Sequence, residues 1–121
     1  MGALDYETIR MGVPAGAIRD LIGAGRLKRS DVAMVIPRRT FERRLSEGQA
    51  LKIDEADALA RLLRVRDHAQ RVFADADLAE EWLTLPNPEL GDEVPIRMAR
   101  TDVGAREVEA VLGRIEHGIF A

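Results

Sequence analysis

The stretch that decides the fold is Ile36-Pro37-Arg38-Arg39-Thr40-Phe41-Glu42-Arg43-Arg44-Leu45. Pro37 interrupts any helix that precedes it, because its ring removes a backbone donor and clashes with the turn before it. After this break, Phe41 and Leu45 are one helical turn apart and can share an inward face. The four arginines then occupy the remaining faces. The stretch therefore predicts a helix, a tight break and a second, basic helix that Gly48 closes.

Upstream of this stretch, the sequence predicts two further helices and an arm. Ser30 is a suitable N-cap for a short helix just before the break. Pro14 suits the first turn of an earlier helix, and the glycines at Gly23 and Gly25 end that helix. Residues 1–12 show only weak periodicity and are expected to form an arm.

Downstream, the spacing of leucine, alanine and valine predicts one long helix over residues 54–74. Asp54 and Asp57 stand at the spacing of an N-cap and the third residue of a helix, which approaches a capping box. Asp75 and Asp77 are candidate caps for the short helix that follows and that holds Trp82. We expect Trp82 to fill core space, although a lone tryptophan is also a natural anchor in an interface.

The C-terminal part begins with a break and ends in a helix. Two prolines within residues 85–91 exclude an α-helix there, because each pushes the preceding residue out of the α region. Pro95 opens a short turn, and Thr101 is the N-cap candidate of the last helix. The inward stripe of that helix consists of Val108, Val111, Leu112 and Ile115. Since no segment alternates like a strand, the sequence predicts an all-α chain of about six or seven helices.

The net charge of −3 conceals a division into two halves. Residues 1–66 hold 13 Lys/Arg and 9 Asp/Glu, a net of +4, and residues 67–121 hold 5 and 12, a net of −7. We expect two domains with these boundaries and with different partners. Because the charge changes sign inside the predicted long helix, the domains are expected to be jointed rather than separated by a flexible linker.

Composition and motifs argue against catalysis and against a metal site. The chain has no cysteine, which excludes disulfides, thiolate nucleophiles and cysteine-bound zinc. His68 and His117 lie far apart in the sequence, and two imidazoles alone make a poor metal site. No Ser-His-Asp order and no Gly-x-Ser-x-Gly elbow is present. We therefore expect no enzyme activity, no metal and no cofactor.

The sequence also predicts a cytoplasmic location. Its start has neither the basic region nor the apolar region of a signal peptide. The longest apolar run, residues 32–36, is far shorter than the roughly 20 residues that cross a membrane. We expect a soluble protein without a membrane partner.

The basic segment predicts a nucleic-acid partner. Residues 26–44 hold seven Lys/Arg against two acidic residues, a net of +5. Two short helices about a tight break form the helix-turn-helix pattern, whose second helix enters the major groove. The alternative is a solvated charged face on an ordinary helix. The candidate DNA-binding residues are Arg38, Arg39, Thr40, Arg43 and Arg44.

A wider set of motifs resembles a known family. The order and approximate spacing from about Val13 to Ala121 are similar to those of the Xre/MbcA/ParS class of antitoxins. The most specific parts, taken together, are Trp82-Leu83 with Pro86-Asn87 and the ending Gly113-Arg114-Ile115-Glu116-His117-Gly118. The resemblance implies an N-terminal Xre-like helix-turn-helix domain and a C-terminal toxin-binding domain.

The resemblance also implies partners. Such proteins pair with a cognate RES-domain toxin that destroys cellular NAD, cover the entrance of its active site, and repress their own operon. An acidic domain suits a pocket that holds positive groups for the phosphates of NAD. A homodimer within a larger toxin–antitoxin complex is expected, because operator half-sites require two copies. The implied toxin-binding residues are Arg114, His117, Gly118, Ile119 and Phe120.

Other interpretations stay open at this point. The chain could be an Xre-type transcription regulator whose C-terminal domain only dimerises, or an interaction protein that has lost DNA binding. His117 could simply favour the dipole at the end of its helix. The apolar residues 119–121 could be a frayed end or a peptide that inserts into a partner.

Overall fold

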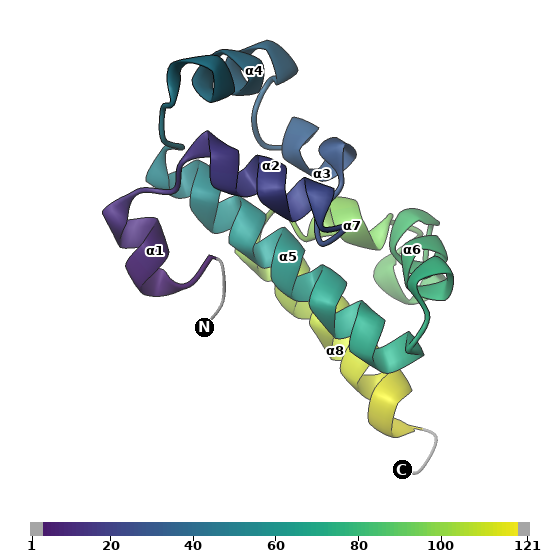
Figure 1. Cartoon of the computed structure of the whole chain (residues 1–121). Helices are drawn as coiled ribbons and strands as arrows, with labels where there is room; N and C mark the ends of the chain where they lie inside the picture. Colours follow the sequence, from purple (N-terminus) through teal and green to yellow (C-terminus); the bar gives the residue numbers. More distant parts are fainter. Residues whose placement is uncertain (1–3, 119–121) are drawn as a thin grey trace. The chain divides into compact units, whose positions relative to one another are not determined.

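The computed structural model of the chain describes residues 4–118, and over that range it contains helices and no β-strand, as predicted (Figure 1). The chain divides into two compact units, Met1–Ala60 and Arg61–Ala121. The helices of the described part are α1 (Tyr6–Met11), α2 (Ala15–Gly23), α3 (Arg29–Ala33), α4 (Arg38–Glu47), α5 (Ile53–Phe73), α6 (Ala76–Thr84), the 3₁₀ turn η1 (Pro88–Leu90), α7 (Pro95–Met98) and α8 (Asp102–Gly118).

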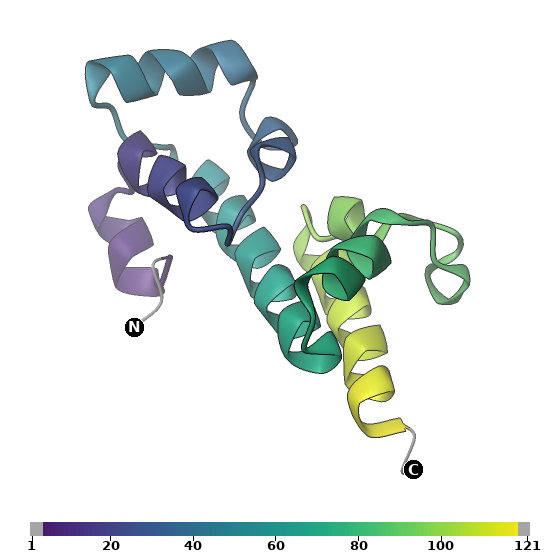
Figure 2. The ribbon, with the colours of Figure 1, turned by 45° about the vertical axis from the view of Figure 1, so that its right-hand side comes forward.

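The first unit is a helix-turn-helix built on α2, α3 and α4. Two backbone hydrogen bonds join the start of α2 to the segment between α4 and α5: Ala15 N–H donates to Gln49 O at 3.0 Å, and Leu51 N–H donates to Val13 O at 2.8 Å. In the views of Figures 1 and 2, α4 lies at the outer edge of this unit. The most deeply buried apolar side chains of the unit are Val13, Ile18, Leu27, Ile36 and Leu59.

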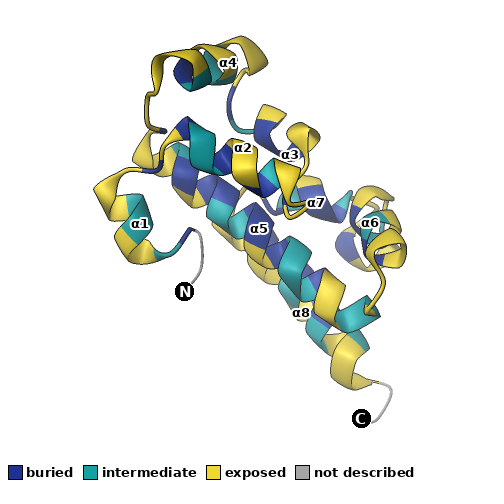
Figure 3. Cartoon of the chain, in the orientation of Figure 1, coloured by how far each residue is buried: buried dark blue, intermediate teal, exposed yellow. Residues whose placement is uncertain are grey.

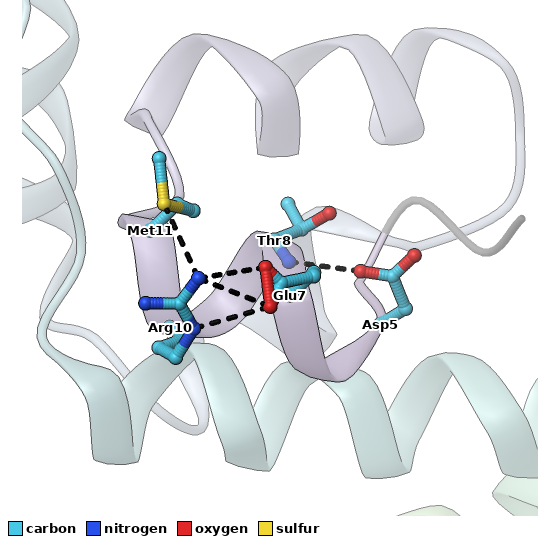
Figure 4. Close-up of polar contacts among 5 residues, drawn as sticks. All are labelled: Asp5, Glu7, Thr8, Arg10 and Met11. Carbon is cyan, nitrogen blue, oxygen red and sulfur yellow. Dashed lines mark hydrogen bonds and ion pairs between the residues drawn. The ribbon is translucent and has the colours of Figure 1, made fainter.

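The expectation of an arm over residues 1–12 is wrong for residues 6–11, which form α1. The carboxylate of Asp5 caps this helix, accepting a hydrogen bond from Thr8 N–H at 2.8 Å, and Arg10 pairs with Glu7 at 2.7 Å (Figure 4). The bond from the Thr8 backbone lowers the pKa of Asp5 below its ordinary 3.8. The cap therefore stabilises α1 at higher pH and is lost as the pH falls through the lowered value.

The start of α3 also differs from the prediction. The N-cap is Lys28, not Ser30, which lies within the helix. The buried carboxylate of Asp31 accepts a hydrogen bond from Lys28 N–H at 2.8 Å. Asp31 thus supplies the side-chain part of a capping box from inside the helix.

At the junction of α4 and α5, the prediction for the end of α4 is confirmed and the prediction for the cap of α5 is wrong. Gly48 ends α4 with φ +65°, a left-handed conformation that favours glycine, as predicted. Helix α5 begins at Ile53, and Glu55 rather than Asp54 or Asp57 caps it. Its Oε1 accepts a hydrogen bond from Lys52 N–H at 2.8 Å.

The second unit packs the later part of α5 beside α8, with α6, η1 and α7 completing it (Figures 1 and 2). Arg64 Nε joins the two long helices through Glu109 Oε2 at 2.7 Å. The stripe predicted on α8 is buried at Val108, Val111 and Leu112, and Ile115 is half-buried. Figure 3 shows buried positions alternating with exposed ones along α5.

The short elements of this unit match their predicted signals. Asp75 caps α6 by accepting hydrogen bonds from the N–H groups of Asp77 and Leu78, and α7 begins at Pro95. The run over residues 85–91 forms no α-helix, but it does hold the single 3₁₀ turn η1. That turn was not expected, and the side chain of Asn87 caps it.

The contact between α7 and α8 depends on a glycine. Thr101 caps α8, as predicted, by accepting a hydrogen bond from Gly104 N–H at 3.0 Å. A Cβ atom at Gly104 would lie 1.9 Å from the carbonyl oxygen of Met98, far inside van der Waals contact. Only glycine lets the last turn of α7 lie this close to α8.

The buried stripe of α8 gives a stability prediction. Leu112→Ala should lower the free energy of unfolding by about 2–5 kcal/mol, because it removes a fully buried side chain and leaves a cavity. Urea denaturation followed by circular dichroism measures it. The matched control on the same helix is Val103→Ala, where the valine is 67% exposed. A Leu112→Ala loss as small as that of the control would contradict the packing.

Candidate functional site

The candidate nucleic-acid interface lies on α4. Arg38, Arg39 and Arg43 are exposed, and Thr40 is half-buried. Arg38 Nε lies 3.3 Å from Glu42 Oε2 on the same helix. The side chains of Arg39 and Arg43 make no hydrogen bond or ion pair with any other residue in the range 4–118. The guanidinium groups are therefore available for forked hydrogen bonds to phosphate or to guanine.

Arg44 does not belong to this surface. Its side chain is only 8% exposed, and its Nη1 pairs with Glu55 Oε1, whose side chain is 13% exposed. To reach a DNA groove, this buried guanidinium would have to leave its carboxylate partner buried without a counter-charge. The structure thus removes Arg44 from the predicted DNA-binding residues and gives it a structural role.

Helices α2, α3 and α4 enclose a groove of about 580 Å³ in the first unit. Arg19, Arg29 and Arg38 line it together with apolar side chains such as Ile36 and Phe41. Arg19 was missed from the sequence, because it precedes the dense charge run over residues 26–44. Its position on the exposed face of a predicted helix was the one available signal.

The predicted toxin-binding residues lie at the end of α8 so far as they are described. Arg114 and His117 are exposed, and Gly118 is the last residue of the helix. Arg114 Nη2 lies 3.7 Å from Glu89 Oε1 of η1, and His117 Nε2 lies 3.5 Å from Glu116 Oε1. Ile119 and Phe120 fall outside the described residues.

The other histidine, His68, lies between α5 and α8. His68 is half-buried on α5, with Nδ1 3.4 Å from Glu109 Oε1 and Nε2 3.7 Å from Glu116 Oε1. Both carboxylates lie on α8, so His68 occupies the junction of these helices. In the part of the chain that the structure describes, no group of three or more histidine and acidic side chains could hold a metal ion. No helix in that part is long and apolar enough to cross a membrane.

Trp82 is neither fully buried nor fully exposed. Its ring centroid lies 5.9 Å from that of Phe73, with the two planes tilted by 43°. It shares a shallow pocket with Leu78 and Leu85. Neither leucine was among the predicted site residues. Both leucines are 53% exposed, so an apolar surface surrounds the tryptophan.

Exposure on α4 predicts the effect of removing its arginines. Arg39→Ala combined with Arg43→Ala should abolish binding to the DNA upstream of the gene while leaving the unfolding midpoint unchanged. The reason is that both side chains are exposed and make no contact that supports the fold. A gel shift compared with the wild type measures it. Unchanged DNA affinity would refute the assignment of α4 as the recognition helix.

Burial of Arg44 gives the opposite prediction. Arg44→Met should destabilise the chain by about 3–5 kcal/mol, because Glu55 is left buried without its partner. Thermal or urea denaturation measures the loss. Arg43→Met is the matched control at the neighbouring exposed position, with an expected change within about 0.5 kcal/mol. Equal stability of the two variants would show that the pair does not hold α4.

Comparison with known proteins assigns both parts of the chain. Residues 6–64 match the family described as the antitoxin Xre-like helix-turn-helix domain. Residues 68–118 match the antitoxin Xre/MbcA/ParS C-terminal toxin-binding domain. The two matches lie in the order that the sequence predicted.

Whole-chain relatives agree with these matches. The chain is 30% identical to the Antitoxin Xre of Yersinia enterocolitica, over 99% of this chain and 83% of that protein. It is 32% identical to the Antitoxin Xre of Pseudomonas putida, over 96% and 75%. Identity to the Antitoxin Xre of Photorhabdus laumondii is 40%, over 69% of this chain but only 57% of that protein. With its helix-turn-helix and its toxin-binding domain, the chain belongs to the Xre family of antitoxins.

Proposed function

We propose that this chain is the antitoxin of a type II toxin–antitoxin system, which neutralises a RES-type, NAD-degrading toxin and represses its own operon. Residues 1–66 bind operator DNA, and residues 67–121 cover the entrance of the toxin's active site. The observation that carries this proposal is the presence in one chain of both family domains, each with the charge that suits its partner. The chain acts as a stoichiometric inhibitor and not as an enzyme.

The geometry of α4 supports the DNA-binding part. Arg38, Arg39 and Arg43 project from a short helix that follows a tight break, and Thr40 accompanies them. The net charge of +4 over residues 1–66 is modest for a DNA-binding domain. Since phosphate contacts supply much of the affinity for DNA, two copies would bind more tightly than one. We therefore propose a homodimer within the toxin–antitoxin complex, with one copy on each operator half-site.

Charge and exposure support the toxin-binding part. A pocket that holds NAD needs positive groups for the phosphates, and residues 67–121 carry a net of −7. The end of α8 presents Arg114 and His117 to solvent. The pair of Arg114 with Glu89 is long and exposed, so little free energy holds it and the arginine can turn towards a partner. We place Arg114, His117 and residues 118–120 at the mouth of the toxin.

A truncation tests the proposed plug. The product of the adjacent open reading frame is expressed as the toxin, with or without this chain. The full chain should restore both growth and cellular NAD. A variant lacking residues 117–121 should leave cells arrested and NAD depleted, because the segment at the mouth of the active site is gone. Growth curves and an NAD assay measure the effect.

The controls separate the two proposed roles. The truncated variant should keep its circular dichroism spectrum and its operator binding, since the buried stripe of α8 ends before residue 117. The double variant of Arg39 and Arg43 should still neutralise the toxin. Full protection by the truncated variant would refute a plug at residues 117–121. Failure of the full chain to bind the neighbouring product would instead favour a transcription regulator without a toxin partner.

A further inference from the structure

The surface around Trp82 is apolar, and no part of the described chain covers it. It is a pocket of about 330 Å³ in the second unit, lined by the end of α5, by α6 and by residues 85–88. Leu78 and Leu85 are more than half exposed at its edge. Contiguous exposed apolar surface of this kind marks an interaction site more often than an isolated exposed leucine does.

The sequence of α6 explains why this surface faces outward. Leu78 and Trp82 are one turn apart on α6 and share a face, and Leu85 follows directly after the helix in an extended conformation. Ala79 and Leu83 form a second stripe, and these two residues are buried in the unit. A helix that packs on one side can bury one stripe, so the other stays available for a partner.

The surroundings of the pocket are acidic. Between Arg71 and Arg97 the chain has seven Asp/Glu and no Lys/Arg. Arg66 pairs with one of them, Glu80, at 2.6 Å, and Arg114 pairs with another, Glu89, at 3.7 Å. Glu81, which lines the pocket, is exposed, and its side chain makes no hydrogen bond or ion pair within the described chain. The apolar centre with an acidic rim therefore fits an apolar side chain that lysine or arginine flanks.

We propose that the pocket formed by Leu78, Trp82 and Leu85 is a second contact site for the toxin, separate from the end of α8. It takes an apolar side chain of the toxin from a basic segment, and Glu81 pairs with that segment. This inference rests on the proposed function. The pocket lies within the toxin-binding match over residues 68–118, and the Arg114–Glu89 pair connects its neighbour η1 to α8.

Charge argues against a second copy of the chain as the occupant. In a symmetric dimer the same patch meets itself, so the acidic rims of two copies would face each other. Like charges opposed across an interface are destabilising. The proposed basic segment of the toxin offers charges of the opposite sign.

The experiment measures binding of the full chain to the purified cognate toxin. Leu78→Gln combined with Leu85→Gln should raise Kd about tenfold or more, because the apolar anchor loses its contacts. Glu81→Lys should raise Kd and reduce its dependence on salt. The matched control is Val103→Gln, an apolar and more exposed position in the same unit, which should leave Kd unchanged. Glu81→Lys keeps the test valid if the double leucine variant loses its fold.

If the wild type binds the toxin and neither the leucine variant nor Glu81→Lys weakens this binding, the pocket is not a contact site for the toxin, and the proposed function still stands. No binding by the wild type would overturn the proposed function itself. Light scattering of the antitoxin alone tests the other occupant. If the leucine variant changes the oligomeric state but not toxin binding, a second copy fills the pocket and the inference is wrong.

Discussion

The buried ion pair between Arg44 and Glu55 joins α4 to the first turn of α5 in the helix-turn-helix unit. The same carboxylate of Glu55 binds the Arg44 guanidinium and caps α5 through Lys52 N–H, so one side chain both starts α5 and anchors α4. With one face of α4 fixed in this way, Arg39 and Arg43 are left on the exposed faces. The surface proposed to bind DNA thus depends on an arginine that is buried beneath it. Removing either partner is costly, because the other charge is then left buried without a counter-charge.

Local backbone chemistry made most of the helices predictable. Pro37, Gly48 and Thr101 act on their own backbone neighbourhood, so the breaks and caps at these positions follow from the sequence. The role of Arg44 does not follow, because its partner is eleven residues away and only the folded chain brings them together. On α6, Leu78 and Trp82 stand one turn apart, and so do Ala79 and Leu83. Spacing alone does not say which of two apolar stripes faces the core.

Opposite charges on residues 1–66 and 67–121 would sort the proposed partners. The acidic residues 67–121 would repel DNA phosphates, so the proposed operator DNA would approach the α4 surface of the basic half. The proposed toxin pocket, with its positive groups, would be repelled by that basic half and attracted to the acidic one. The repulsion is as useful as the attraction, because it suppresses the wrong pairing of domain and partner. The overall charge of −3 conceals this arrangement entirely.

The place of Trp82 also makes the protein easy to observe. The chain contains one tryptophan and one tyrosine, and Tyr6 lies in the first unit while Trp82 lies in the second. Selective excitation of the indole therefore reports the second unit alone, in unlabelled protein. Because the indole stands half-buried beside Phe73, either filling of the pocket or loosening of α6 changes its contact with water. The chain carries a built-in fluorophore at the surface where a partner is expected to arrive.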